Sequence, residues 1–129
     1  MKKGFVIVMM IVLAACSPKL EEKTLKEFYT EASIHEVEQL IIVDGSTGYQ
    51  KVIQSPPVIQ QLMEQIDEIV FIPQANQEAR SGWRYNVTLI DGEHQFQFAL
   101  SQIGNVYYET SPDLTPIIDT FYKNVESEE

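Results

Sequence analysis

Two short stretches combine a histidine with carboxylates, the residue types of acid–base catalysis and of metal sites. His35 begins the stretch 35–38 (His-Glu-Val-Glu), and His94 ends the stretch 91–94 (Asp-Gly-Glu-His). An imidazole held by a carboxylate can act as a general base, and the same side chains bind Zn²⁺. Either site requires the fold to bring the two stretches together. The alternative is that both histidines are exposed, His35 at the start of a strand and His94 beside a turn.

A second candidate is the stretch 80–85, Arg-Ser-Gly-Trp-Arg-Tyr. It contains the only two arginines and the only tryptophan of a chain whose formal net charge is −10. Arginine and tryptophan are frequent hot spots of interfaces, where they accept a carboxylate, a phosphate or an aromatic group. We therefore identify Arg80, Trp83, Arg84 and Tyr85 as candidate partner-binding residues. The alternative is that Trp83 and Tyr85 face the core while the arginines pair with nearby acids.

The only cysteine, Cys16, marks the end of an apolar leader. Two lysines at positions 2 and 3 precede an uninterrupted apolar run over residues 5–13, and two alanines follow it. This order is typical of a secretory signal peptide. The run is shorter than the ~20 residues that a membrane-spanning helix needs. The sequence therefore predicts export and removal of the leader rather than a retained span.

The stretch Leu13-Ala14-Ala15-Cys16 resembles the lipobox of bacterial lipoproteins at all four positions. The resemblance implies that Cys16 receives a diacylglyceryl group and becomes the first residue of the mature protein. It also implies a lipid anchor at the extracytoplasmic face of the cell membrane. Residues 1–15 would be the lipoprotein signal peptide. The alternative is an ordinary secreted protein with a chance cysteine at this position.

Length and charge limit what the mature chain can do. Removal of residues 1–15 leaves 114 of the 129 residues, enough for one small domain. An acylated Cys16 leaves no thiol for catalysis or for a disulfide. The acidic charge disfavours nucleic acid as a partner, and no phosphate-binding, dinucleotide-binding or EF-hand spacing occurs. We therefore expect no cofactor, no metal and no catalytic residue.

Hydrophobic periodicity divides the rest of the chain. Residues 16–33 are polar, with four apolar or aromatic residues at helical spacing near the end, which predicts a lipidated N-terminus and flexible tether followed by a short amphipathic helix. Strict alternation beyond it predicts strands, with Trp83 and Tyr85 on the same face of one of them. The expected strands cover 35–44, 49–54, 70–72, 83–91, 94–100 and 106–109, and the expected helices begin after Ser55-Pro56 and near Thr115.

These elements predict an α+β fold. The domain would span residues 34–126 in a two-layer ββαβββα arrangement, with a mostly antiparallel sheet and both amphipathic helices on one face. Glutamine, threonine, asparagine and arginine would occupy the other face. Residues 127–129 (Ser-Glu-Glu) would form an acidic, solvated tail, because acids at a helix C-terminus oppose the macrodipole.

The mature chain also resembles, loosely, small uncharacterised lipoproteins of Gram-positive bacteria. The similar features are the turn residues Asp44, Gly45, Thr47 and Gly48, the stretch 82–85 (Gly-Trp-Arg-Tyr) and the closing helix. The similarity covers most of residues 35–125 and implies no activity.

Three functions remain open from the sequence. The first is a non-catalytic, membrane-anchored lipoprotein that binds a protein partner or an envelope ligand through residues 80–85 and the exposed face of the sheet. The second is an inhibitor or regulator of an extracytoplasmic enzyme or signalling protein. The third is a small hydrolase or metal-binding protein built on His35 and His94.

Overall fold

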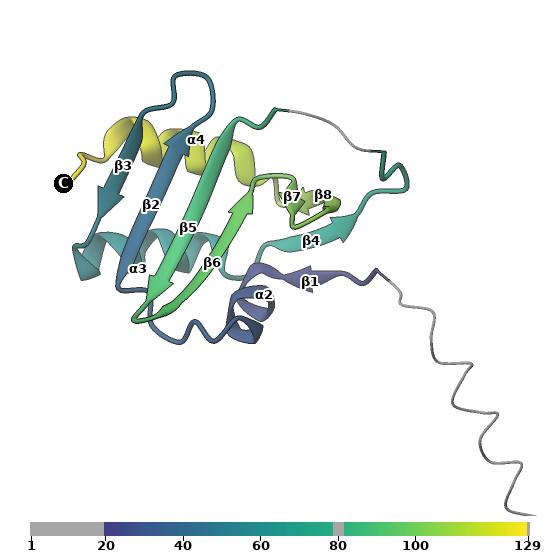
Figure 1. Ribbon diagram of the computed structural model, residues 1–129, viewed down its shortest axis with the longest axis horizontal. Helices are drawn as coiled ribbons and strands as arrows, with labels where there is room; N and C mark the ends of the chain where they lie inside the picture. The colour runs from purple at the N-terminus through teal and green to yellow at the C-terminus, as the bar shows by residue number, and fades with distance from the viewer. Residues whose placement is uncertain (1–19, 79–81, 129) are drawn as a thin grey trace, which may run out of the picture.

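Eight strands form one sheet, with three helices packed around it, in the computed structural model, which describes residues 20–78 and 82–128 (Figure 1). All neighbouring strands are antiparallel, in the order β1-β4-β8-β7-β6-β5-β2-β3. The prediction of an α+β fold with an antiparallel sheet is thus confirmed. The elements are β1 (Lys23–Thr24), α2 (Leu25–Glu31), β2 (Gln39–Asp44), β3 (Gln50–Ile53), α3 (Pro56–Ile66), β4 (Val70–Pro73), β5 (Tyr85–Asp91), β6 (His94–Ala99), β7 (Gln102–Ile103), β8 (Val106–Ser111) and α4 (Leu114–Asn124).

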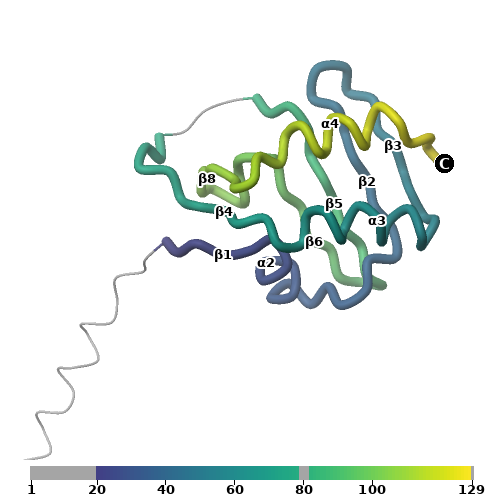
Figure 2. Tube along the Cα trace, turned by 180° about the vertical axis from the view of Figure 1, so that it is seen from behind, coloured from purple at the N-terminus to yellow at the C-terminus, as the bar shows by residue number. Residues whose placement is uncertain are grey.

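Helices α3 and α4 run behind strands β2, β3 and β5 in Figure 1 and in front of them in Figure 2, which is seen from behind. Each helix buries one apolar stripe, as amphipathic helices do. The buried side chains of β2 and β5 alternate along the strand, which leaves the other face of these strands to partly exposed residues. The stripes are Ile59, Leu62, Met63 and Ile66 on α3, and Leu114, Ile118 and Tyr122 on α4.

The element order is longer than ββαβββα. Five strands, β4 to β8, rather than three lie between α3 and α4, and the N-terminal segment adds β1 and α2 to the fold. Strand β1 pairs with β4, and α2 follows it directly. Thr24 and Glu27 form a capping box in which each side chain accepts a hydrogen bond from the other residue's backbone N–H, at 3.1 and 2.9 Å. Leu25 is fully buried. The predicted tether over 16–33 is therefore too long, and the folded domain begins near Lys23 rather than at residue 34.

A cluster of five aromatic rings connects strands β4 and β8 with β6, across the short strand β7. Strand β6 pairs with β7 at a single position, Ala99 with Gln102, so backbone pairing is sparse at this point. The rings come from α2, β4, β6 and β8, with centroids 5.7–6.4 Å apart in stacked and edge-to-face pairs. The cluster consists of Phe28, Phe71, Phe96, Phe98 and Tyr108.

The C-terminal residues lie along β3, which is an edge strand of the sheet. The N–H of Glu128 donates to the carbonyl of Val52 at 2.7 Å, and the N–H of Val52 donates to Oγ of Ser127 at 3.0 Å. Lys51 Nζ donates to the carbonyls of Tyr122 and Val125, where a cation complements the C-terminal end of α4. Residues 127 and 128 are exposed, as the predicted solvated tail requires, but these hydrogen bonds hold them against β3; Glu129 lies outside the described residues.

A tyrosine–aspartate hydrogen bond joins α2 to the end of α3. The hydroxyl of Tyr29, which is 7% exposed, donates to Oδ1 of Asp67 at 2.5 Å. Burial, followed by this hydrogen bond, raises the pKa of Tyr29 above its ordinary value. The bond fixes the N-terminal helix against the C-cap residue of α3.

We expect Tyr29→Phe to lower the free energy of unfolding by about 2 kcal/mol, because a buried hydrogen bond to a charged group is lost while the ring remains. Urea denaturation followed by circular dichroism measures the change. Tyr49→Phe is the matched control, since the Tyr49 side chain is 74% exposed. Equal stabilities of the two variants would contradict the structural role of the Tyr29 hydroxyl.

Candidate functional site

The candidate stretch 80–85 lies at the start of β5. The strand begins at Tyr85, two residues later than expected, and Gly82 precedes it with φ +92°. Residues 83 and 84 are not in strand conformation, so the alternation on which the sequence prediction relied begins only at Tyr85. Arg80 lies outside the described residues, as does Cys16.

Tyr85 belongs to the core. Its side chain is 1% exposed, and its ring lies 5.2 Å from that of Tyr122. The Tyr85 hydroxyl donates to Oδ1 of Asp119 on α4 at 2.6 Å. Burial, followed by this hydrogen bond, raises the pKa of Tyr85. Tyr85 cannot contact a partner directly, so its assignment to the partner-binding surface is wrong.

Arg84 is paired within the fold. Its Nη2 lies 2.9 Å from Oδ1 of Asp119, and Lys123 Nζ lies 3.0 Å from Oδ2 of the same carboxylate. The Tyr85 hydroxyl and Lys123 lower the pKa of Asp119 below its ordinary value of 3.8, and the charge of Arg84 contributes. Arg84 thus has the acidic partner that the alternative interpretation of this stretch expected.

Trp83 is the exposed aromatic residue of the stretch, at 44% of its surface. A Cβ atom on Gly45 would lie 2.1 Å from the Trp83 carbonyl oxygen and 2.8 Å from the nearest atom of its ring. The N–H of Gly45 also donates to the carbonyl of Arg84 at 2.7 Å. Because Trp83 lies so close to Gly45, a larger residue at position 45 would clash with it. The β2–β3 turn therefore requires glycine there and holds the indole in place. The alternative interpretation, in which Trp83 faces the core together with Tyr85, is therefore wrong for Trp83.

The indole borders a small pocket of about 190 Å³. Asn86 and Gln97 line it from strands β5 and β6, on the opposite face of the sheet from Tyr85 and Val87. The sequence placed both amides on the polar face, but their convergence with Trp83 depends on the bend at residues 82–84. The other lining residues are Phe98, Ala99, Gln102 and Gly104.

The two histidine-containing stretches do meet in the fold. Oδ2 of Asp91 accepts from the backbone N–H groups of His35 and Glu36 at 2.8 and 3.1 Å. These two bonds lower the pKa of Asp91 below its ordinary value. Both imidazoles lie on exposed residues. Within residues 20–78 and 82–128, no group of three or more potential ligand side chains is arranged to hold a metal ion.

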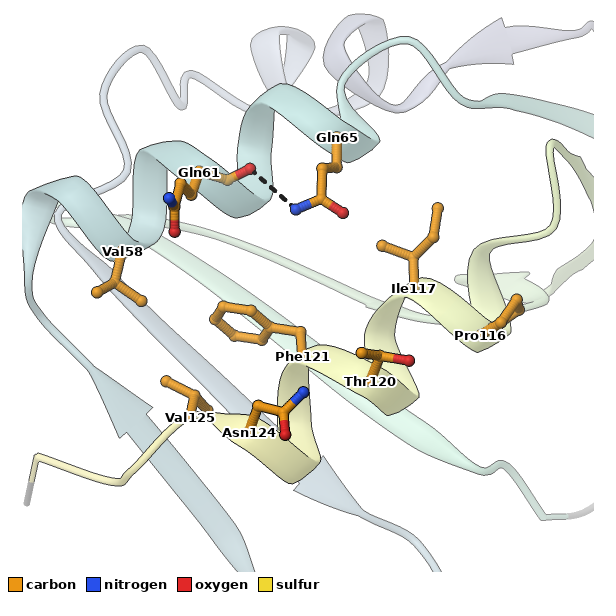
Figure 3. A pocket seen from close by; sticks show the side chains of 9 residues that line it. All are labelled: Val58, Gln61, Gln65, Pro116, Ile117, Thr120, Phe121, Asn124 and Val125. Carbon is orange, nitrogen blue, oxygen red and sulfur yellow. Dashed lines mark hydrogen bonds between the residues drawn. The ribbon is translucent and has the colours of Figure 1, made fainter.

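A groove of about 550 Å³ runs between α3 and α4 (Figure 3). Its side chains carry no formal charge. Figure 3 shows Phe121 between the two helices, facing α3, and Gln61 and Gln65 along the α3 side. The lining residues are Val58, Gln61, Gln65, Pro116, Ile117, Thr120, Phe121, Asn124 and Val125.

Sequence reasoning missed this groove, although α4 carried a signal for it. The apolar residues of α4 form two rows at i, i+4 spacing. The row that ends at Tyr122 is buried, whereas Ile117, Phe121 and Val125 are only partly buried. An apolar stripe two rows wide exceeds what contact with one sheet requires.

None of the helices in the described part of the chain is long and apolar enough to cross a membrane.

Because folding lowers the pKa of Asp119, its ionised form stabilises the folded state above about pH 5, and the contribution is lost as the pH falls through the lowered pKa. We expect Asp119→Asn to flatten the decline of unfolding free energy between about pH 5 and pH 3. Tyr85→Phe, which removes the donor hydroxyl, should flatten the decline partly. Urea denaturation at each pH measures the profiles, and three parallel profiles would contradict this role.

Comparison with known proteins gives no relative for this chain. No protein-family model, no curated protein and no solved structure matches it.

Proposed function

We propose that the protein is a bacterial lipoprotein, anchored through Cys16 at the extracytoplasmic face of the cell membrane, whose folded domain is a non-catalytic binding module. The order of basic residues, apolar run, small residues and cysteine supports the anchor. An acyl chain contributes ~0.8 kcal/mol for each buried CH₂ group, and two chains give a stable attachment.

The start of the fold limits how far the domain would stand from the membrane. Lys23, the first residue of β1, lies seven residues after Cys16. A fully extended chain of seven residues spans at most about 25 Å. In this proposal the domain stays next to the bilayer, and its ligand belongs to the membrane-proximal part of the envelope.

The observation that carries the binding role is the exposure of Trp83. Exposing the large apolar surface of a tryptophan side chain to water is unfavourable in free energy, and tryptophan is enriched at binding hot spots. Trp83 is held in place by the turn at Gly45 and is partly exposed beside the amide-lined pocket. Within this proposal the ββαβββα unit is a two-layer platform, with the helices on one face and the binding surface on the other.

Replacement of the cysteine tests the anchor. We expect the wild-type protein, expressed in a bacterium, to partition into the detergent phase and to carry a diacylglyceryl group on Cys16 by mass spectrometry. Cys16→Ser should lose the lipid, because a hydroxyl does not replace the thiol in that modification. Ser17→Ala is the matched control and should remain lipidated. An unlipidated wild-type chain in which residues 1–15 have been removed would contradict the anchor.

Because Trp83 is the only tryptophan of the chain, its fluorescence reports on its surroundings directly. We expect a glycan, polyphosphate or peptide fraction of the bacterial envelope to shift its emission in the detergent-solubilised protein. Trp83→Ala should reduce binding of the same fraction by at least tenfold in isothermal titration calorimetry. Tyr49→Ala, another exposed aromatic residue, is the control and should bind normally. No response to any fraction would contradict a binding role for Trp83.

A further inference from the structure

The groove between α3 and α4, here called the α3–α4 groove, has an apolar wall that the described part of the chain leaves partly open (Figure 3). Val58, Ile117, Phe121 and Val125 pack against the core, but each is only partly buried. No lining side chain carries a formal charge, in a chain with a net charge of −10. A ligand that covers these four side chains would remove apolar surface from water, which is favourable. The α3–α4 groove therefore suits a neutral, apolar ligand.

The dimensions of the groove indicate a thin, elongated ligand. Its lining extends from Val58 and Val125 at one end to Gln65 and Pro116 at the other. Each helix has 11 residues and is therefore about 16 Å long. A third helix of that length, about 10–12 Å across, would occupy roughly 1,300–1,800 Å³. The groove has about 550 Å³, within the ~300–1,000 Å³ of small-molecule sites. A helix would lie mostly outside this volume, whereas an acyl chain is thin enough to lie within it.

The end of the groove at Gln65 lies close to the point where the N-terminal segment enters the fold. The backbone N–H of Lys26 donates to the carbonyl of Asp67, two residues after Gln65, at 3.1 Å. Figure 2 shows β1 on the side of the molecule where α3 ends and α4 begins.

The chain before β1 is long enough to return to this end of the groove. Lys23 precedes Lys26 by three residues, so β1 leads the chain away by at most about 11 Å. The seven residues from Cys16 to Lys23 span up to about 25 Å. Residues 20–22 belong to no helix or strand, so the chain is free to change direction before β1. An acyl chain on Cys16 is therefore within reach of the groove.

From these features we propose that the α3–α4 groove binds one acyl chain of the lipid on Cys16. The inference rests on the proposed lipid anchor and gives its acyl chain a second binding site, separate from the bilayer and from Trp83. The acyl chain enters the groove at Gln65 and lies along Ile117 and Phe121. Gln61 and Gln65 border it on the α3 side without placing a charge beside it.

Occupation of the groove makes the anchor reversible. Two acyl chains attach a protein stably to a membrane, whereas a single chain gives only marginal, reversible binding. The bilayer surrounds an acyl chain on all sides and competes with the groove, which is open to solvent. The groove therefore lowers the membrane affinity of the protein and shields one acyl chain from water when the protein leaves a bilayer.

The test presents a single acyl chain to the groove without a bilayer. The mature chain, residues 16–129, is alkylated at its only cysteine with one hexadecyl chain that bears a photoactivatable diazirine. On irradiation in detergent-free buffer, we expect cross-links within one monomer. Mass spectrometry should map them to the groove-lining residues of α3 and α4. Cross-links only elsewhere in the domain, or only between copies, would overturn the proposal.

A charge on the groove wall should release the acyl chain. Ile117→Asp should reduce the intramolecular cross-links at least fivefold and raise partition of the alkylated protein into neutral phosphatidylcholine vesicles at least fivefold. Thr115→Asp, at an exposed position of the same helix outside the groove lining, adds the same charge and should behave like the wild type. Equal partition of the two variants would contradict acyl-chain binding. Circular dichroism checks their folding, and if Ile117→Asp fails to fold, the cross-link map of the wild type decides.

Failure of this inference is distinguishable from failure of the anchor. The alkylated chain tests the groove directly, whereas the mass of the protein made in a bacterium tests lipidation of Cys16. Lipidation without cross-links in the groove would overturn the inference and leave the anchor intact. Cross-links in the groove together with an unlipidated, processed Cys16 would overturn the anchor and this assignment of the ligand. If an added photoactivatable phospholipid labels the groove but the chain on Cys16 does not, a bilayer lipid is the occupant and the proposal is overturned.

Discussion

Few backbone hydrogen bonds join β6 to β7, so the sheet would be weakly connected at this point. Packing among five aromatic rings holds its two parts together. Strand β7 has two residues, and β6 meets it at one pair of positions. Phe28 brings α2 into contact with rings from β4, β6 and β8. The position of α2 in turn fixes β1, and with it the point from which the chain continues toward its N-terminus. The geometry of any membrane attachment therefore depends on this aromatic cluster.

Carboxylates connect distant parts of the chain. Asp67 accepts from Tyr29, Asp91 from two backbone N–H groups near His35, and Asp119 from Tyr85, over separations of 34 to 56 residues. A charged carboxylate accepts stronger hydrogen bonds than a neutral group does, and the bonds to Tyr29 and Tyr85 are partly buried. The acidic composition is therefore not only a source of solubility, because these three acids join helices, strands and loops.

Local patterns predicted the elements whose residues alternate or repeat within a few positions. The β2–β3 and β5–β6 hairpins and the two longer helices follow directly from such patterns. The role of the N-terminal segment was missed because it depends on a few tertiary contacts, those of Leu25, Phe28 and Tyr29. The direction of Trp83 could not be deduced, since it depends on the backbone at Gly82 and on a turn 38 residues earlier. The burial of Oδ1 of Asn86 without a hydrogen-bond donor likewise depends on tertiary contacts, which the sequence does not show.

The segment at residues 127 and 128 has a consequence for association between copies of the chain. An edge strand with free N–H and carbonyl groups is a template to which another strand can add, and this is a common route to aggregation. Here the chain's own C-terminal residues bond to β3, through Val52 and Gln54. A foreign strand would first have to displace them. This self-occupied edge therefore disfavours the addition of a strand from another copy of the chain.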